Sequence, residues 1–146
     1  MNITIVSLDN WGFNEHIKKS LQSQGHDVVH INFNSFKYKY PNFLHKIGNF
    51  FYKIFLNKNL KHEYYGAKII EKLQENPIKQ DVILTLKGDF IDAKSLLEFK
   101  KYSNQSIAFF NDNIKRYPNI KNVIKSFDEV YSFEKQDCLK YNLKFA

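Results

Sequence analysis

Cysteine and arginine are scarce in this chain of 146 residues. Cys138 is the single cysteine, so no internal disulfide can form, and this usage indicates a reducing compartment. No apolar run reaches the length of a membrane-spanning helix, and no basic, apolar leader follows Met1. We therefore expect a cytoplasmic protein. Arg116 is the only arginine, whereas lysine supplies every other permanent positive side-chain charge.

Several motifs that define common catalytic or binding sites are also missing. The glycines form neither the Gly-x-Gly-x-x-Gly loop of dinucleotide-binding folds nor a phosphate-binding Gly-x-x-x-x-Gly-Lys-Ser/Thr loop. The histidines lack zinc-ligand spacing, and there is no Gly-x-Ser-x-Gly nucleophile elbow. The apolar run at 81–86 ends without the aspartate of a phosphoacceptor receiver domain. We therefore expect no bound metal and no cofactor.

The remaining composition is that of one folded domain. Hydrophobic residues make up 43% and aromatic residues 16% of the chain, which excludes a disordered protein and supplies one core. The formal net charge is +7. Lysine and asparagine are abundant throughout, as in proteins from AT-rich genomes, so this charge is weak evidence for an anionic partner.

Strands and helices alternate along the chain. The hydrophobic pattern predicts strands at 2–7, 27–33, 81–86, 106–110 and 129–133, and the first half of a sixth at 143–146. It predicts helices from Phe13 to a stop at Gly25 and at 42–56, 63–75, 92–102, 119–126 and 134–141. The first strand–helix–strand unit favours a parallel sheet. We predict an α/β, Rossmann-like three-layer domain over 1–146 with a helical insert at 36–76. Because the chain stops within the sixth strand, we expect it to be part of a longer protein.

The segment 36–62 contains six lysines and no acidic residue. After Pro41, apolar side chains recur at helical spacing and form one stripe, which comprises Phe43, Leu44, Ile47, Phe50, Phe51, Ile54 and Phe55. In one interpretation the stripe packs on the sheet or on the next helix. In the other it faces an anionic membrane or a lipid-linked substrate, with Lys46 and Lys53 beside it. Nucleic acid fits poorly, because the aromatics do not alternate with the lysines.

Polar residues follow three of the predicted strands. They are Asp9, Asn10, Trp11 and Gly12 after the first, Lys87, Gly88 and Asp89 after the third, and Asn111, Asp112, Asn113 and Arg116 after the fourth. In an open parallel sheet, ligands bind outside the carboxyl ends of the strands. The fold would bring the three groups to one sheet edge, which predicts a ligand cleft there. Strand-end loops are usually polar, so ordinary turns would also explain each group.

Three segments resemble the CgeB-like glycosyltransferase family, which includes spore-maturation and lipopolysaccharide-biosynthesis proteins. Val82-Ile-Leu-Thr-Leu-Lys-Gly88 is similar to a family strand that ends in Lys-Gly. Ile107-Ala-Phe-Phe-Asn-Asp-Asn113 is similar to a strand ending in Trp-Asp-Ser/Asn, with Phe110-Asn111 where the family often has tryptophan. The segment 127–141 resembles the family pattern Phe-Asp-x-Val-Phe-Ser-Phe-Asp-x-x-Asp. The likeness is close over 81–146 and loose over the first 35 residues.

The resemblance implies that the chain is the N-terminal, acceptor-side half of a GT-B glycosyltransferase of cell-surface polysaccharide or lipopolysaccharide synthesis. It implies that a C-terminal domain binds most of the nucleotide-sugar donor, that no metal is required, and that this half alone is inactive. The acceptor would be a glycan or a lipid-linked molecule, with peripheral contact at the inner membrane face.

An inverting transferase needs a general base that deprotonates the acceptor hydroxyl. Our first candidate is Asp112, followed by Asp9 and Asp89. Lys87 and Arg116 would hold phosphate oxygens, since the planar fork of arginine suits them, and Trp11 would stack on a sugar. The predicted substrate-binding set is completed by Asn10, Gly12, Gly88, Asn111 and Asn113.

A non-catalytic alternative also fits the sequence. The chain would then be a flavodoxin-like binding or interaction module, and the basic aromatic helix at 42–56 would be its docking surface.

Overall fold

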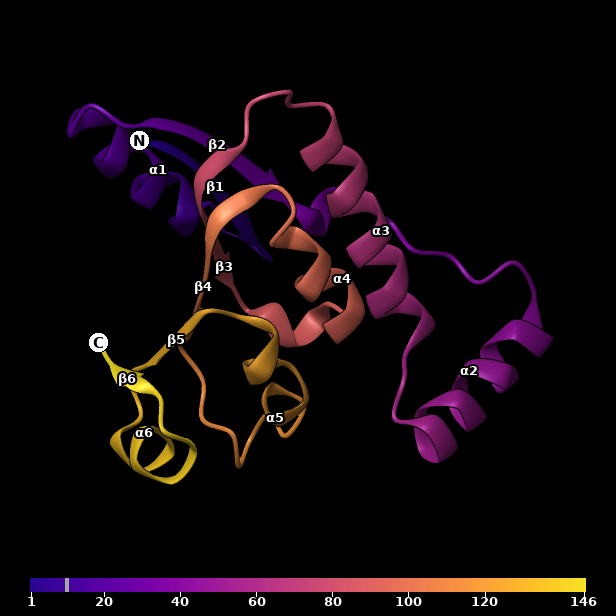
Figure 1. The fold of residues 1–146 in the computed structure, drawn as a ribbon. Helices are drawn as coiled ribbons and strands as arrows, with labels where there is room; N and C mark the ends of the chain where they lie inside the picture. Colours follow the sequence, from indigo (N-terminus) through magenta and orange to yellow (C-terminus); the bar gives the residue numbers. More distant parts are fainter. Residues whose placement is uncertain (10) are drawn as a thin grey trace.

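The computed structural model describes residues 1–9 and 11–146. One sheet holds six strands in the order β2-β1-β3-β4-β5-β6, and all neighbouring pairs are parallel (Figure 1). The strands are β1 Asn2–Ser7, β2 Asp27–Asn32, β3 Gln80–Leu86, β4 Ser103–Phe110, β5 Glu129–Ser132 and β6 Lys144–Phe145. The predicted α/β, Rossmann-like architecture with a parallel sheet is therefore confirmed.

Six α-helices and three short 3-10 turns connect these strands within the described ranges. The helices are α1 Phe13–Ser23, α2 Phe43–Leu56, α3 Leu60–Gln74, α4 Ala93–Phe99, α5 Ile120–Val123 and α6 Lys135–Tyr141. The 3-10 turns are η1 Phe33–Ser35, η2 Gly88–Phe90 and η3 Ile124–Ser126. The strands and α-helices follow the predicted order. The turns η1 and η2 were not predicted, and the predicted helix at 119–126 is divided into α5 and η3.

Helices cover both faces of the sheet and make three layers. On one face, Ile69 of α3, Leu96 of α4 and Ile120 of α5 pack with strand residues in the larger core cluster. On the other face, Leu21 of α1 packs in a smaller cluster, with Ile5 of β1 among its buried members. Successive β-strand side chains point to opposite faces, so β1, β2, β3 and β4 contribute to both clusters. The main core therefore lies between the sheet and the α3–α4–α5 layer.

Helix α3 and strand β4 begin earlier than the sequence predicted, and local contacts explain both differences. Helix α3 begins at Leu60, three residues early, because the side chain of Asn59 accepts a hydrogen bond from the backbone N–H of Lys61. Strand β4 begins at Ser103 instead of residue 106, since Ser103 is still in register with Gln80 of β3. Asn142 ends α6 in the left-handed conformation, with φ of 55°.

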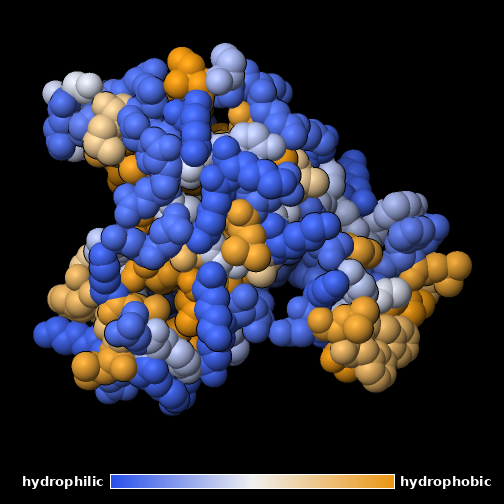
Figure 2. Space-filling model, in the orientation of Figure 1, coloured by the Kyte–Doolittle hydropathy of each residue, from blue (hydrophilic) through white to orange (hydrophobic). Residues whose placement is uncertain are grey.

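Helix α2 stands off the body of the molecule (Figure 1). Its buried residue is Asn49, whereas its apolar side chains are exposed, with Phe43 at 72% and Phe55 at 76%. Figure 2 shows them as a hydrophobic patch at the right of the molecule. The interpretation that this stripe packs on the sheet or on the next helix is therefore wrong.

Within the described ranges, no helix combines the length and the apolar character needed to cross a membrane.

Candidate functional site

The three polar strand ends lie at one edge of the sheet, as expected. Ser7 of β1 is in register with Leu86 of β3, and Leu86 is in register with Phe109 of β4. The chain moves outward from β1 to β2 and then in the opposite direction from β3 onward, so the switch point lies between β1 and β3. Open α/β sheets bind ligands outside the carboxyl ends of strands at this point.

Asp9, after β1, is a capping residue. Its buried carboxylate accepts hydrogen bonds from the backbone N–H groups of Trp11, Gly12 and Asn14, at 3.1, 2.8 and 2.9 Å. Burial acts to raise the pKa of Asp9, but these bonds outweigh it and lower the pKa below the ordinary value. Asp9 holds the start of α1 and is a poor base, so the structure does not favour it as the proton acceptor.

Trp11 and Gly12 lie beside this cap on the surface. Trp11 is 80% exposed, and its ring meets that of Phe13 edge to face with centroids 6.4 Å apart. Gly12 has φ of 76°, a conformation that glycine adopts without steric cost. Asn10, which the sequence analysis placed in the substrate-binding set, lies outside the described residues. An exposed aromatic ring is thus available near the sheet edge.

The side chains of Lys87 and Asp112 form an ion pair between the ends of β3 and β4. The Lys87 Nζ lies 2.5 Å from Asp112 Oδ2, and it also lies over the ring of Tyr117 at 5.2 Å from the centroid. Lys87 holds a left-handed backbone conformation with φ of 61°, which is costly for a residue with a Cβ. The carboxylate of Asp112, our first candidate for the general base, is therefore held in an ion pair with Lys87.

Asp89 lies in η2, directly after β3, and its carboxyl group is perturbed by burial. Its residue is only 7% exposed, and burial raises the pKa of Asp89 to about 6. Its own backbone N–H and Lys87 oppose this increase, and Asp112 adds to it. Gly88 allows this segment to pack closely against Phe127, because a Cβ on residue 88 would lie 3.0 Å from the Phe127 ring. The site therefore contains a buried carboxyl group whose pKa is raised towards neutrality.

The loop after β4 is built on a turn and on a contact from α6. Asn113 accepts a hydrogen bond from the backbone N–H of Arg116 at 2.7 Å, and the guanidinium lies over the Tyr117 ring, 5.4 Å from its centroid. No ion pair with Arg116 occurs in the part of the chain that the structure describes. The buried Asp137 accepts from the backbone N–H of Ile114 at 2.7 Å. Arg116 and the exposed Asn111 thus present free polar groups at the edge.

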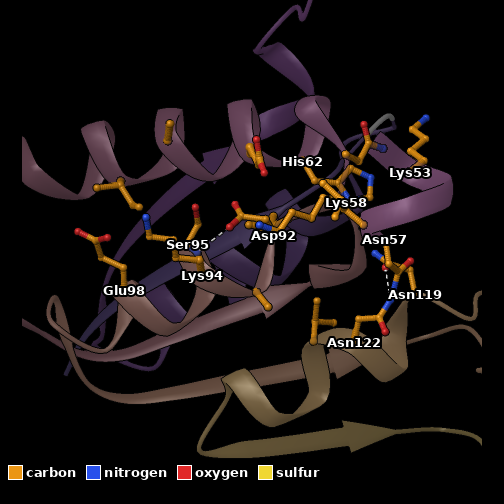
Figure 3. A pocket seen from close by; sticks show the side chains of 18 residues that line it. Lys53, Asn57, Lys58, His62, Asp92, Lys94, Ser95, Glu98, Asn119 and Asn122 are labelled. Carbon is orange, nitrogen blue, oxygen red and sulfur yellow. Dashed lines mark hydrogen bonds between the residues drawn. The ribbon is translucent and has the colours of Figure 1, made fainter. Parts of the chain in front are cut away.

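A pocket of about 900 Å³ lies next to this edge (Figure 3). Its walls come from the end of α2, the α2–α3 connection, α3, α4 and α5. Polar groups predominate among the labelled side chains, which include Lys53, Lys58, His62, Asp92, Asn119 and Asn122. The other predicted docking lysine, Lys46, lies farther along the exposed surface of α2. This pocket is therefore a second region that could receive a polar ligand.

Two ionisable groups in the pocket are desolvated. Burial lowers the pKa of His62 to about 4, with help from Lys53 and Lys61 and against Asp92. The Oδ1 of Asp92 caps α4 by accepting from the N–H of Ser95 at 3.0 Å. Its Oδ2 is buried and has no hydrogen-bond partner among the described residues. His62 is accordingly neutral at physiological pH, and Asp92 offers one free acceptor.

Asn119 connects the pocket with the strand ends. Its side-chain amide donates to the backbone carbonyl of Asp89, and its Oδ1 accepts from Asn122 at 2.8 Å. Sequence reasoning missed Asn119, Tyr117, His62 and Asp137, since no local pattern marks a residue that acts through packing between distant elements. Asp92 carried a signal, because an aspartate directly before an apolar run with helical spacing is a typical N-cap.

No group of three or more His, Cys, Asp or Glu side chains within the described ranges is arranged to hold a metal ion. No protein-family model, curated protein or solved structure matches this chain.

Proposed function

We propose that this chain is the N-terminal, acceptor-side domain of a GT-B glycosyltransferase that transfers sugar from a nucleotide-sugar donor in cell-surface polysaccharide or lipopolysaccharide synthesis. The observation that carries the proposal is Asp89 at the carboxyl end of β3, whose pKa is raised to about 6 beside the Lys87–Asp112 pair. Perturbed carboxyl groups at a strand-end edge are typical of catalytic sites. The likeness of 81–146 to the CgeB-like family supports the same function.

Asp89 is the proposed general base. A base acts best when its pKa is near the working pH, which favours Asp89 over the ion-paired Asp112. Asp89 accepts the proton of an acceptor hydroxyl while that oxygen forms a bond to the anomeric carbon of the donor. The nucleoside diphosphate leaves with the electron pair of the broken bond. Lys87 and Arg116 offset the charge that develops on its phosphate oxygens.

We assign the acceptor to the pocket and to the exposed ring of Trp11, which follows β1. A glycan is held by many hydrogen bonds, and Asn119, Asn122 and Asp92 offer donors and acceptors there. Trp11 provides a flat exposed surface for a sugar ring. The donor is assigned mainly to a C-terminal domain, so this domain alone binds acceptor without turnover.

The replacement Asp89→Asn tests the base in a protein that contains both domains. We expect its turnover to fall about 10²–10⁴-fold with little change in the acceptor KM, because a general base contributes by that factor. Glu71→Gln is the matched control, since Glu71 is an exposed helix carboxylate that pairs with Lys68. Near-normal turnover of Asp89→Asn would remove Asp89 from the chemistry.

Asp89→Asn should lower turnover but raise the stability of the fold. The pKa of Asp89 is raised from 3.8 to about 6, so its neutral form stabilises the fold below pH 3.8, and this stability is lost as the pH rises through 6. Asp89→Asn should therefore increase the free energy of unfolding by up to about 3 kcal/mol above pH 6 and have little effect below pH 3.8. Denaturant titrations across this range measure it. A gain in stability with a loss of turnover is typical of a functional residue.

A non-catalytic interaction module is the second candidate, and the outward apolar face of α2 favours it. The two functions differ in one measurement. A protein containing this domain transfers labelled sugar from a nucleotide-sugar donor to a glycan or lipid-linked acceptor in the first case and shows no transfer in the second.

A further inference from the structure

We propose that α2 docks this protein onto an anionic membrane surface, with the helix lying in the plane of the lipid headgroups. The proposal does not depend on the transferase function. It concerns the face of α2 that carries Phe43, Ile47, Phe50, Phe51 and Ile54, which we call the α2 apolar face.

Helix α2 is attached to the body through its polar side. The buried Asn49 donates to Tyr40 Oη at 2.7 Å and accepts from the backbone N–H of Leu60 at 2.9 Å. Tyr52 donates from its hydroxyl to Glu63 Oε1 at 2.9 Å. These directional bonds fix the rotation of the helix about its axis. The α2 apolar face is therefore held outward by specific contacts.

This orientation is the reverse of that in an ordinary surface helix, which buries its apolar stripe. Phe50, Phe51 and Ile54 are between 51% and 60% exposed. Figure 2 shows a hydrophobic patch where α2 lies in Figure 1. The rings of Phe51 and Phe55 stack with centroids 6.1 Å apart, which joins the patch into one surface. Contiguous exposed apolar surface of this kind marks an interaction site.

The charges around the patch select an anionic surface. Lys46 and Lys53 are exposed and lie four residues before and three residues after Phe50, so both border the α2 apolar face. Between residues 36 and 62 there is no acidic residue. A helix with aromatic residues on one side and lysines beside them is typical of segments that insert shallowly among anionic headgroups.

The length of α2 also suits a position in the plane of the membrane. Its 14 residues extend about 21 Å at 1.5 Å per residue, which is shorter than the hydrocarbon core of a bilayer. A second copy of the chain suits the patch less well. Antiparallel two-fold pairing of two α2 helices would bring Lys46 and Lys53 of both copies to one rim, where the segment 36–62 offers no carboxylate to pair with them.

Vesicle flotation of this chain tests the proposal. We expect binding to vesicles of phosphatidylcholine mixed with phosphatidylglycerol, and little binding to phosphatidylcholine alone or in high salt. Lys46→Glu with Lys53→Glu should lower the apparent affinity at least about twentyfold, because each lysine near an anionic surface contributes roughly fivefold. Phe50→Ser with Ile54→Ser should abolish binding. Lys19→Glu with Lys125→Glu is the matched charge control at two exposed lysines outside α2, and it should reduce binding less.

Circular dichroism of each variant verifies that the fold is kept, since the replaced side chains are exposed. Equal loss of binding in the α2 lysine variant and in the control would overturn the proposal, because net charge alone would then explain it. So would absent binding at low salt. Sedimentation that shows a dimer dissociated by Phe50→Ser with Ile54→Ser would assign the patch to a second copy.

A fluorescence measurement locates the docking face. In a Trp11→Phe background, tryptophan introduced as Phe51→Trp should shift its emission to shorter wavelength on addition of the anionic vesicles. Tryptophan introduced as His45→Trp, near the polar side of the helix, should shift less. The reverse pattern, or no shift at either position while the protein floats with the vesicles, would contradict docking through the α2 apolar face.

Discussion

Helices α2 and α3 follow each other in the chain and have nearly equal lengths of 14 and 15 residues, but they present their apolar sides in opposite directions. Helix α3 buries Tyr65, Ile69 and Leu73 against the sheet, whereas α2 buries Asn49 and exposes its aromatic residues. Both have the periodicity of an amphipathic helix. The comparison shows that periodicity defines a face, while the contacts of the opposite side decide whether this face is covered by the protein or by a partner.

The largest test of this difference is a matched pair of isoleucine replacements. Ile69 is fully buried in α3, and Ile54 is 60% exposed in α2. Ile69→Ala should reduce the free energy of unfolding by about 2–5 kcal/mol, because it removes core contacts and leaves a cavity. Ile54→Ala should change it by less than about 0.5 kcal/mol. Denaturant unfolding of both variants measures the contrast, and equal losses would mean that the α2 apolar face is covered by the protein itself.

The second test uses His62, which lies near the start of α3 and lines the pocket. Burial, with Lys53 and Lys61, lowers the pKa of His62 from 6.5 to about 4. A lowered pKa stabilises the fold above pH 6.5, and this stability is lost as the pH falls through 4. The free energy of unfolding should fall less between pH 6.5 and pH 4 in His62→Phe than in the wild type, by up to about 3 kcal/mol.

Asp89 acts in the opposite direction over part of the same range, since its raised pKa stabilises the fold as the pH falls from about 6 to 3.8. The wild-type curve alone therefore conceals both effects. The difference between wild type and His62→Phe, measured by urea unfolding at several pH values, isolates the histidine. A difference that does not vary between pH 6.5 and 4 would show that His62 is solvated, and the junction of α2 with α3 would then be open to water.

The sequence predicted the sheet, the element order and the shared edge of three strand ends, because apolar periodicity and β-branched runs act locally. It did not predict which carboxyl group is perturbed. Asp112 was the first candidate, but the pairing of Asp112 with Lys87 and the burial of Asp89 arise from residues that meet only across strands. The sequence did not decide what covers the α2 apolar face, since a stripe with bordering lysines fits either a protein core or a lipid surface. Asn49, which settles its direction, has no local signal.

The smallest test compares one glycine in each helix. A Cβ on Gly66 of α3 would lie 2.4 Å from Ser95 Cβ and 2.5 Å from Asp92 Oδ2, so α3 and α4 would have to separate. Gly66→Ala should therefore destabilise the protein by about 1–3 kcal/mol. A Cβ on Gly48 of α2 has no heavy atom within 4 Å, so Gly48→Ala should stabilise the helix by about 0.5–1 kcal/mol. Denaturant unfolding measures the first effect, and hydrogen exchange of α2 amides measures the second. Slower exchange in Gly48→Ala without loss of vesicle binding would show that α2 is a preformed docking element, since a helix that formed only on the membrane would gain no protection in solution.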